Sequence, residues 1–387
     1  MWYLMVFALA AMSALTIIQI PREWLKNKIL RAFVIIYHSI GIASVALILF
    51  AVYRMKDGFL RELIVWTETV YFTLTLFGLF LSLVRWLAFE VARRFKHKNV
   101  LRALNSHTAF FLAVIGVSAL YLVPSVYNAT NLKTAEYNVN VEKTCSADNL
   151  SVTVVSDFHV GAGARRSEMD KMLEAVNAAN SDVILICGDV CDSSSSVSDL
   201  EYMEQTLKKL SCRYGVYYAE GNHEKECRFD PDPYLSRAGV VILKDKGVRL
   251  ENGVNIVGRK NELKKSAATI MDECGLNADE PTIVAQHRTK GLEQLDGVAD
   301  LAVCGHTHGY QYPFAGLRMP VLVSVLYGYR TFGNTQAIVS SGVAEWGYRT
   351  KWPSKSEIVV INVNFSRMKT NLNRPQSRRF RSAKKAA

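Results

Sequence analysis

Cysteine and histidine are scarce in this sequence of 387 residues, which contains seven of the first and eight of the second. The odd number and irregular spacing of the cysteines specify no disulfide framework, and no spacing matches a closed zinc site. Cys187 and Cys304 each end an apolar run, as small buried thiols usually do. No segment resembles a nucleic-acid-binding module or an internal repeat. These absences exclude a closed zinc module and a repeat architecture, and no nucleic-acid partner is expected.

The first third of the chain, by contrast, is rich in long apolar runs. Four runs approach the roughly 20 residues that cross a hydrocarbon core of ~30 Å: residues 2–20, 32–53, 63–84 and 109–126. A cleaved signal peptide would begin with a positive region and end at small residues, whereas run 2–20 does neither. We therefore expect a bundle of about four transmembrane helices within residues 1–130. A signal peptide in place of the first run, or an amphipathic or re-entrant segment in place of one run, remains an alternative.

Basic residues are unevenly distributed between the connections that join these runs. The second connection is mixed, and the stretch after the fourth run has little lysine or arginine before Lys133. The first and third connections are basic: Arg22, Lys26, Lys28 and Arg31, and Arg93, Arg94, Lys96, Lys98 and Arg102. Since basic loops stay on the cytoplasmic side, we expect a multi-pass membrane protein with everything after about residue 130 outside the cytoplasm. A miscount of one helix would reverse this orientation.

The net charge of +11 comes partly from those connections and partly from the tail over residues 366–387. The tail sequence RPQSRRFRSAKK has almost no apolar residue, which favours a solvated, disordered end. A second interpretation remains open, in which the tail is a polybasic segment attracted to anionic lipids or polymers.

From about Tyr137 onward the pattern becomes that of a globular α/β domain. Five short runs rich in valine, isoleucine and alanine end at turn residues, as buried strands do: LSVTVVSD, SDVILICGD, GVYYAEGN, PTIVAQH and ADLAVCGH. Helical stretches, such as residues 166–180 and 198–210, lie between some of them. This alternation predicts layers of helices and sheets. We expect a linker or leading strand over residues 131–149 and the domain itself over residues 150–365.

Residue types that bind metals follow each of the five runs. They are Asp157, His159, Asp189, Asn222, His287, His306 and His308, with His223 and Glu224 beside Asn222. In open α/β sheets ligands bind at the carboxyl ends of strands, and imidazole together with carboxylate oxygen suits zinc, iron or manganese. Seven groups exceed the need of one ion, but they suit two ions about 3.5–4 Å apart that share one carboxylate. Asp189, alone on its loop, is the natural bridge.

In chain order these residues form the blocks D-x-H, G-D, G-N-H-E, H and G-H-x-H. This pattern resembles the calcineurin-like metallophosphoesterase superfamily over roughly residues 150–365. The sequence VSSGVAEWGYRTKWPSKSEIVVINV, residues 339–363, also resembles the end of its membrane-associated branch, in which such a domain follows several helices. The resemblance implies a four-layer α-β-β-α sandwich and a membrane-anchored hydrolase of phosphate esters or anhydrides.

The resemblance also implies a role for each matching residue. His223 would act as the general acid, with Glu224 as its orienting partner. Two divalent ions, manganese, zinc or iron, would activate a hydroxide that attacks phosphorus in line, and His223 would protonate the leaving oxygen. The implied ligands are Asp157, His159, Asp189 and His308 for the first ion, and Asp189, Asn222, His287 and His306 for the second.

Four further residues carry weaker predictions. Asp192 is a candidate partner for a metal-bound histidine, and a helix N-cap is equally compatible with it. Arg165 and Arg166 follow the glycine-rich stretch HVGAG and are candidates to pair with substrate phosphate, although an exposed helix start also explains them. Arg349, within residues 339–363, is another candidate for substrate binding.

These residues do not define the substrate. Thr289 and Tyr310 stand where this branch often has proline and glycine, so its substrate preferences cannot be carried over. Anchoring at a lipid bilayer favours a lipid-linked phosphate or pyrophosphate, or another phosphorylated small molecule of the cell envelope. A nucleotide-linked glycolipid would require a cytoplasmic site, which conflicts with the expected orientation.

Two alternatives from other functional classes remain. A non-catalytic metal-binding or regulatory module would be expected to lose ligands, and none of the seven positions is lost. A membrane sensing or transport unit regulated by the domain would need several central charged residues in its helices, and these are few.

Overall fold

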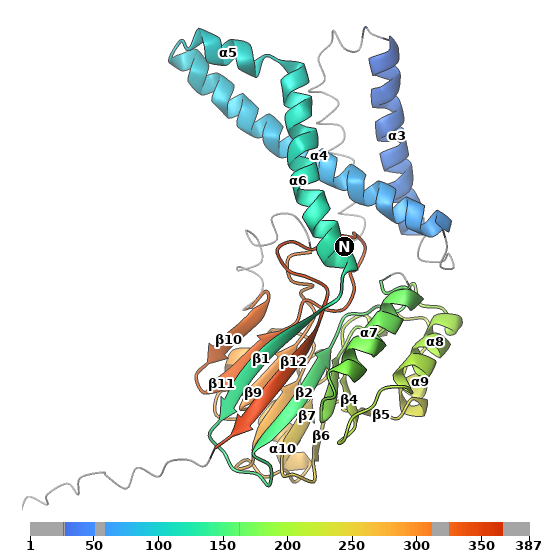
Figure 1. Ribbon diagram of the computed structural model, residues 1–387, viewed down its shortest axis with the longest axis vertical. Coiled ribbons are helices and arrows are strands. Elements are labelled where there is room, and N and C mark those ends of the chain that lie inside the picture. Colours follow the sequence, from blue (N-terminus) through green and yellow to red (C-terminus); the bar gives the residue numbers. More distant parts are fainter. Residues whose placement is uncertain (1–25, 27, 51–58, 162, 312–324, 367–387) are drawn as a thin grey trace, which may run out of the picture.

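The computed structural model describes every residue of the chain except 1–25, 27, 51–58, 162, 312–324 and 367–387 (Figure 1). An N-terminal helical part lies above a domain of two β-sheets in this view. The apolar run 2–20 and nearly all of the basic tail fall outside the described residues.

Four helices form the described portion of the N-terminal part. They are α3 (Lys28–Phe50), α4 (Phe59–Arg94), α5 (Lys98–Leu104) and α6 (His107–Thr130). Two of these, α4 and α6, are long and apolar enough to cross a membrane, whereas α3 has a shorter apolar stretch at Val34–Ala43. Within the described residues, therefore, two of the four expected spans are found as candidates.

Local signals in the sequence mark the ends of these helices. Ser106 caps α6, because its side-chain oxygen accepts a hydrogen bond of 3.3 Å from the backbone N–H of Ala109. In α4, Glu62 lies in the first turn and Arg93 and Arg94 lie in the last turn, where they complement the helix dipole. At 36 residues, α4 is about 54 Å long, so roughly 16 of its residues are not needed to cross a core of ~30 Å.

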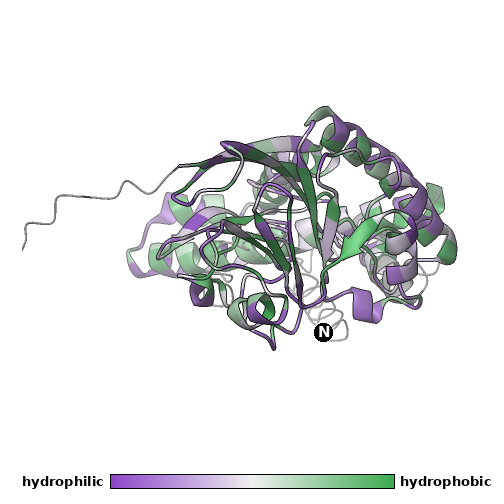
Figure 2. Cartoon of the chain, turned by 90° about the horizontal axis from the view of Figure 1, so that it is seen from below, coloured by the Kyte–Doolittle hydropathy of each residue, from purple (hydrophilic) through white to green (hydrophobic). Residues whose placement is uncertain are grey.

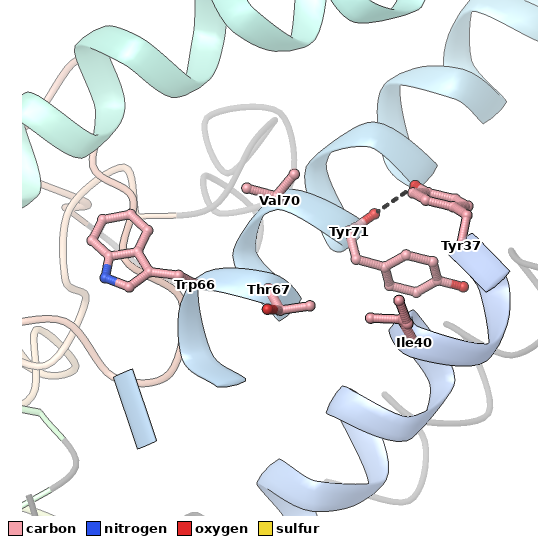
Figure 3. Close-up of a pocket in the computed structure, with 7 residues that line it drawn as sticks. Tyr37, Ile40, Trp66, Thr67, Val70 and Tyr71 are labelled. Atoms are coloured by element: carbon pink, nitrogen blue, oxygen red, sulfur yellow. Dashed lines mark hydrogen bonds between the residues drawn. The ribbon is translucent and has the colours of Figure 1, made fainter. Parts of the chain in front are cut away.

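The helices α3 and α4 approach closely at Gly41, where a side chain would collide with the ring of Tyr71. Tyr37 donates a hydrogen bond of 3.5 Å to the backbone oxygen of Tyr71 (Figure 3). A cavity of about 380 Å³ opens at this crossing, lined by Tyr37, Ile40, Gly41, Trp66, Thr67, Val70 and Tyr71. All of these residues belong to α3 and α4, so the cavity is separate from the predicted metal ligands.

The domain contains two mixed sheets of six strands each. The first has the order β1-β12-β2-β3-β4-β5, and its strands are β1 (Lys133–Val141), β2 (Asn149–Val155), β3 (Val183–Cys187), β4 (Val216–Ala219), β5 (Val240–Ile242) and β12 (Glu357–Phe365). The second has the order β10-β11-β9-β8-β7-β6, and its strands are β6 (Lys246–Arg249), β7 (Asn255–Gly258), β8 (Thr282–Ala285), β9 (Leu301–Cys304), β10 (Gly328–Phe332) and β11 (Thr335–Val339). Neighbours from β2 to β5 are parallel, and so are β7, β8, β9 and β11.

Helices cover the outer face of each sheet. The first sheet packs against α7 (Arg166–Ala178), α8 (Val197–Leu207) and α9 (Asp232–Arg237), and the second against α10 (Ala267–Glu273) and the 3-10 helix η3 (Leu292–Leu295). A third apolar core lies between the sheets, and Figure 2 shows largely hydrophobic strands inside the domain. The predicted α/β architecture is confirmed, and the layers follow the order of an α-β-β-α sandwich.

A short connection joins α6 to the first sheet. Only Asn131 and Leu132 separate α6 from β1, which pairs in parallel with β12. Ser356, just before β12, donates hydrogen bonds to the backbone oxygens of Asn128 at 3.0 Å and Ala129 at 2.8 Å. The candidate membrane helix α6 is thus fixed directly to the edge of the first sheet.

Candidate metal centre

The carboxyl ends of five strands bring the predicted metal ligands together. Both sheets contribute to this edge, which we call the ligand edge. Asp157 and His159 follow β2, Asp189 follows β3, Asn222 follows β4, His287 follows β8, and His306 and His308 follow β9.

Two groups of side chains along the ligand edge are close enough to hold metal ions. The first contains Asp157, His159, Asp189 and His308, and the second contains Asp189, His287 and His306. Within each group the ligand atoms lie within 4.8 Å of one another. Asp189 belongs to both groups, which is the position expected of a carboxylate that bridges two ions.

Short contacts show how the ligand atoms face one another. The Nε2 atom of His287 lies 3.0 Å from Oδ2 of Asp189, and the Nε2 atoms of His159 and His308 are 3.3 Å apart. Buried Oδ1 of Asn222 has no hydrogen-bond partner among the described residues. Because buried amide oxygens are normally satisfied, this atom fits the ligand role that the resemblance implies for the second ion.

Several ligands have strained backbone conformations. Among the described residues, nine that are not glycine have a positive φ, and five of these are predicted ligands: Asp157, His159, Asp189, His306 and His308. Such conformations cost about 1–3 kcal/mol each and persist where the surrounding fold over-determines them. The rest of the fold therefore compensates for this strain and holds these side chains at the ligand edge.

Glycine makes two of the turns possible. A side chain on Gly305 would collide with the carboxylate of Asp157. Gly188 has φ +77°, and a Cβ there would lie 2.5 Å from the backbone of Gly221. The ends of β9 and β2, and those of β3 and β4, therefore approach closely because Gly305 and Gly188 have no side chains.

The electrostatics of the ligand edge favour cations. Burial alone would raise the pKa of Asp189, but His287, His159 and His223 hold that pKa well below its usual range. Burial lowers the pKa of His306 to about 4 and of His308 to about 3, which leaves both imidazoles neutral. Burial would also lower the pKa of His287, but Asp189 raises it to about 10. The ionised carboxylate of Asp189 and the neutral imidazoles of His306 and His308 are donors of the types that zinc, iron and manganese prefer, whereas His287 would give up a proton when it binds a metal.

Comparison with known proteins connects this geometry to a family. Residues 150–310 match the model of the calcineurin-like phosphoesterases. The protein is a calcineurin-like metallophosphoesterase. It is 28% identical over 302 residues to an uncharacterized metallophosphoesterase of Helicobacter pylori strain J99, which covers 76% of this chain and 78% of the relative.

Some relatives of this metallophosphoesterase are named as membrane proteins. A transmembrane protein with metallophosphoesterase domain from Bos taurus is 28% identical over 247 residues, covering 56% of this chain and 53% of that protein. Its counterpart of the same name from Danio rerio is 27% identical over 281 residues, covering 67% and 63%. The metallophosphoesterase is therefore similar to transmembrane proteins, in agreement with the candidate spans α4 and α6.

Acceptors on the outer side of the ligand edge orient the histidines. The Nδ1–H of His287 donates to the backbone oxygen of Cys187 at 2.7 Å. Nδ1 of His159 lies 3.4 Å from Oδ2 of the buried Asp192, so the structure places Asp192 beside a predicted ligand, as expected. Such outer partners fix which imidazole nitrogen faces a metal. The carbonyl of Cys187 had no signal in the sequence, because any residue can supply it.

The surroundings of His223 differ from the prediction in one respect. Its Nδ1 lies 3.1 Å from Glu226, which ends the 3-10 helix η2 (Glu224–Glu226). Glu224 instead accepts a hydrogen bond of 2.7 Å from the backbone N–H of Val190, and burial, together with Asp189, raises its pKa to about 8. Glu224 is therefore wrongly predicted as the partner of His223; spacing by three residues on a helical turn favours Glu226.

An aromatic side chain from a distant part of the chain completes this corner. The ring of Trp346 lies 5.0 Å from the ring of His223. Trp346 belongs to the loop between β11 and β12, residues 340–356, which we call the closing segment. Its backbone N–H groups at Val343 and Ala344 donate to the carbonyls of Ser156 and Asp157 at 2.9 and 3.2 Å. The closing segment thus packs directly on the ligand edge.

The three arginines predicted to bind substrate are engaged elsewhere. Arg166 donates to Ser198 at 2.8 Å and lies over the ring of Tyr202. Arg165 pairs with Glu62 at 3.2 Å and with Glu168. The guanidinium group of Arg166 thus packs against α8, and that of Arg165 is held by two carboxylates. A substrate role for either residue stays a prediction.

The prediction for Arg349, by contrast, is wrong, because its side chain lies inside the protein. Its side chain is 2% exposed and faces three carboxylates: Glu62 at 3.2 Å, Glu345 at 3.3 Å and Glu168 at 3.6 Å. Burial would lower its pKa, but these carboxylates raise it above the usual value for arginine. Arg349 is therefore a structural cation inside the protein rather than a group presented to a substrate.

Proposed function

We propose that this metallophosphoesterase binds two divalent ions along the ligand edge and hydrolyses a lipid-linked or cell-envelope phosphate ester or pyrophosphate. The observation that carries the proposal is the presence of Asp189 in both groups of ligands. When bound, two such ions lower the pKa of water and neutralise charge on phosphoryl oxygens. The donor set is compatible with manganese, zinc or iron.

The side chains of the protein supply the remaining chemistry. His223 stands beside the ligand edge and donates its proton to the leaving oxygen, which avoids expulsion of a basic alkoxide. Glu226 at 3.1 Å orients the imidazole of His223 through Nδ1. Asp189 accepts a hydrogen bond of 2.9 Å from the backbone N–H of His223, so the bridging carboxylate and the acid are held at a fixed separation.

Proximity to the bilayer supports a substrate at the membrane. The candidate span α6 ends two residues before β1, and α4 contacts the loop that follows His159. A lipid-linked phosphate diffusing in the bilayer would therefore meet the ligand edge without leaving the membrane surface. We propose a multi-pass arrangement in which run 2–20 and α3 accompany α4 and α6.

An outward-facing domain is supported by the position of the basic connection. The residues between α4 and α6, including α5, lie at the end of these helices opposite the catalytic domain (Figure 1). Since Lys and Arg in short loops stay in the cytoplasm, the domain lies on the other side. At 24 residues, α6 is about 36 Å long, enough for one crossing. This argument depends on α6 alone and not on the number of helices before it.

A hydrolysis assay on the full chain in detergent or nanodiscs tests the proposed reaction. The protein is stripped of metal, resupplied with Mn²⁺, Zn²⁺ or Fe²⁺, and given p-nitrophenyl phosphate, its bis-ester, an alkyl phosphate and a prenyl pyrophosphate. We expect metal-dependent turnover that His223→Ala lowers by about 10²–10⁴-fold for the alkyl ester. The loss is smaller for nitrophenolate, a leaving group that needs no proton. His97→Ala, at the start of α5, serves as the control; metal-independent turnover, or equal losses for both leaving groups, would contradict the mechanism.

Thiol labelling tests the orientation separately. Cys274 is exposed, whereas the other described cysteines are buried or half-buried. In intact cells a membrane-impermeant maleimide should label the protein at Cys274. The Cys274→Ser variant, which lacks this thiol, should lose that labelling. Labelling only after cell lysis would place the domain in the cytoplasm.

A further inference from the structure

Side chains from the first turns of α4 reach two loops of the catalytic domain, and we call this set of contacts the seam. The guanidinium group of Arg61 donates to the backbone oxygen of Gly161. Glu62 accepts from Arg165 through one carboxylate oxygen and from Arg349 through the other, each at 3.2 Å. Arg61 and Arg349 are buried, at 4% and 2% exposed, whereas the side chain of Glu62 is 22% exposed, so the seam is a packed contact that reaches the surface at Glu62.

Seven residues further along, about two helical turns, α4 contacts the closing segment again. The hydroxyl oxygen of Thr69 accepts a hydrogen bond of 3.3 Å from the backbone N–H of Arg349. The rings of Phe72 and Tyr348 stack with centroids 4.4 Å apart and planes 23° from parallel. Positions 62, 69 and 72 of α4 lie on one face of the helix, and that face is the one that meets the domain.

Both loops of the seam lead directly to the ligand edge. Gly161 lies two residues after His159, and the guanidinium group of Arg349 donates to the backbone oxygen of Gly163 at 3.0 Å. The closing segment bonds the carbonyl of Asp157 through Ala344 and carries Trp346 against His223. Arg349 thus joins α4, the loop after His159 and the closing segment in one buried contact.

We propose that α4 is a structural component of the active site, in which Glu62 and Thr69 are positioning residues that hold the loop after His159 and the closing segment in place. Glu62 acts through Arg349 and Arg165, and Thr69 acts through the backbone of Arg349. A shift of α4 moves both loops. His159 would then move at the metal site, and Trp346 would move relative to the ring of His223. The membrane part of the chain is therefore required for catalysis and is more than an anchor.

Paired variants of the full chain separate this role from general effects on the helix. Glu62→Gln removes the charge at the seam, and Glu90→Gln makes the same change on α4 where the carboxylate pairs with Arg93 at the surface. Thr69→Val removes the hydroxyl that accepts from Arg349, and Thr67→Val is its match, because both threonines donate to the carbonyl four residues earlier. Thr69→Ser restores the hydroxyl and should restore the property that Thr69→Val loses.

Three measurements decide the proposal: kcat with KM, the affinity for Mn²⁺, and hydrogen–deuterium exchange of residues 343–352. We expect Glu62→Gln to lower kcat about tenfold with little change in KM and to weaken Mn²⁺ binding about tenfold, the scale of lost outer-shell support. Thr69→Val should lower kcat about threefold, and both variants should exchange faster over residues 343–352. Glu90→Gln, Thr67→Val and Thr69→Ser should match the wild type.

The proposal is overturned if the Glu62 variant behaves like the wild type. Unchanged kcat and Mn²⁺ affinity in Glu62→Gln, with or without faster exchange, would reduce the seam to a stabilising contact. If Glu62→Gln does not fold, Thr69→Val with its two matched variants decides in the same way. The kinetic part rests on the proposed function; a wild type that hydrolyses none of the esters would defeat that function, while Mn²⁺ affinity and exchange would still decide the role of α4.

Discussion

The ligand edge and the seam are both buried and rich in charge, but they are assembled from different kinds of sequence. Along the ligand edge, each ligand follows its strand within a few residues, as Asp189 follows β3 and His287 follows β8. At the seam, Glu62 meets Arg349 across 287 positions of the chain, and no local pattern in the sequence pairs the two residues. The metal ligands are thus encoded locally, whereas the contact of the domain with α4 is encoded only in the tertiary structure.

The two regions also balance their charges differently. The ligand edge contains the carboxylates of Asp157 and Asp189 and has room for added cations. The seam supplies its own cations, Arg165 and Arg349, to the carboxylates around them. Loss of a group from the ligand edge should therefore remove metal. Loss of a group from the seam should instead shift the loop after His159 and the closing segment. The predictions below use this contrast.

The largest effect is expected at the residue shared by both groups of ligands. Asp189→Asn should lower kcat/KM by about 10³-fold, the scale on which a single group that stabilises transition-state charge acts. Asp170→Asn is the matched control, since that carboxylate bonds Tyr202 on the exposed side of α7. Steady-state kinetics of the two variants at saturating Mn²⁺ make the comparison. A loss in kcat/KM of less than tenfold would show that Asp189 does not bridge two metal ions.

An intermediate effect is expected one layer outward. Asp192→Asn should weaken Mn²⁺ affinity by about 10–100-fold, because outer partners of ligating histidines act on this scale, and His159 would lose the carboxylate at 3.4 Å. Asp192 also accepts a hydrogen bond of 2.7 Å from the backbone N–H of Ser194. If that turn is its only role, a Mn²⁺ titration will show an affinity within twofold of the wild type.

The smallest effect is expected at the exposed partner of His223, the proposed general acid. The carboxylate side chain of Glu226 is 52% exposed, so solvent screens its pairing with His223. Glu226→Gln should lower kcat about threefold for an alkyl phosphate and leave nitrophenyl phosphate unchanged. Glu273→Gln, which breaks a surface pair with Lys265 at similar exposure, controls for loss of surface charge. Equal kcat for Glu226→Gln and the wild type on both substrates would show that His223 acts without help from the Glu226 carboxylate.

The sequence predicts the ligand edge well because the constraints there are local. Strand-forming runs that end in glycine and a polar ligand leave little freedom, and the structure brings Asp157, His159, Asp189, His287 and the later histidines together at the expected edge. The left-handed backbone at five of these positions could not be predicted, since nothing in the letters D, H or GD fixes φ without the neighbouring strand.

The predictions that fail concern partners chosen by packing. Arg349 is a predicted substrate-binding residue because it lies in the sequence of residues 339–363 that resembles the family, yet its surroundings are set by Glu62 on α4 and by Glu168 on α7. The resemblance implies Glu224 as the orienting partner of His223, but adjacent residues on a helical turn point in different directions. Contacts between distant segments leave no trace in a single sequence, and the arginines of buried networks look the same as those of binding sites.

Metal content tests the central claim, that the ends of strands from two sheets form one dinuclear site, most directly. The full chain is loaded with Mn²⁺, freed of unbound ion, and analysed for metal per chain alongside Asp189→Asn. The account predicts about two ions per wild-type chain and one or none in the variant, with hydrolysis following the doubly loaded form. A wild-type chain that holds one ion, or a variant that still holds two, would contradict it.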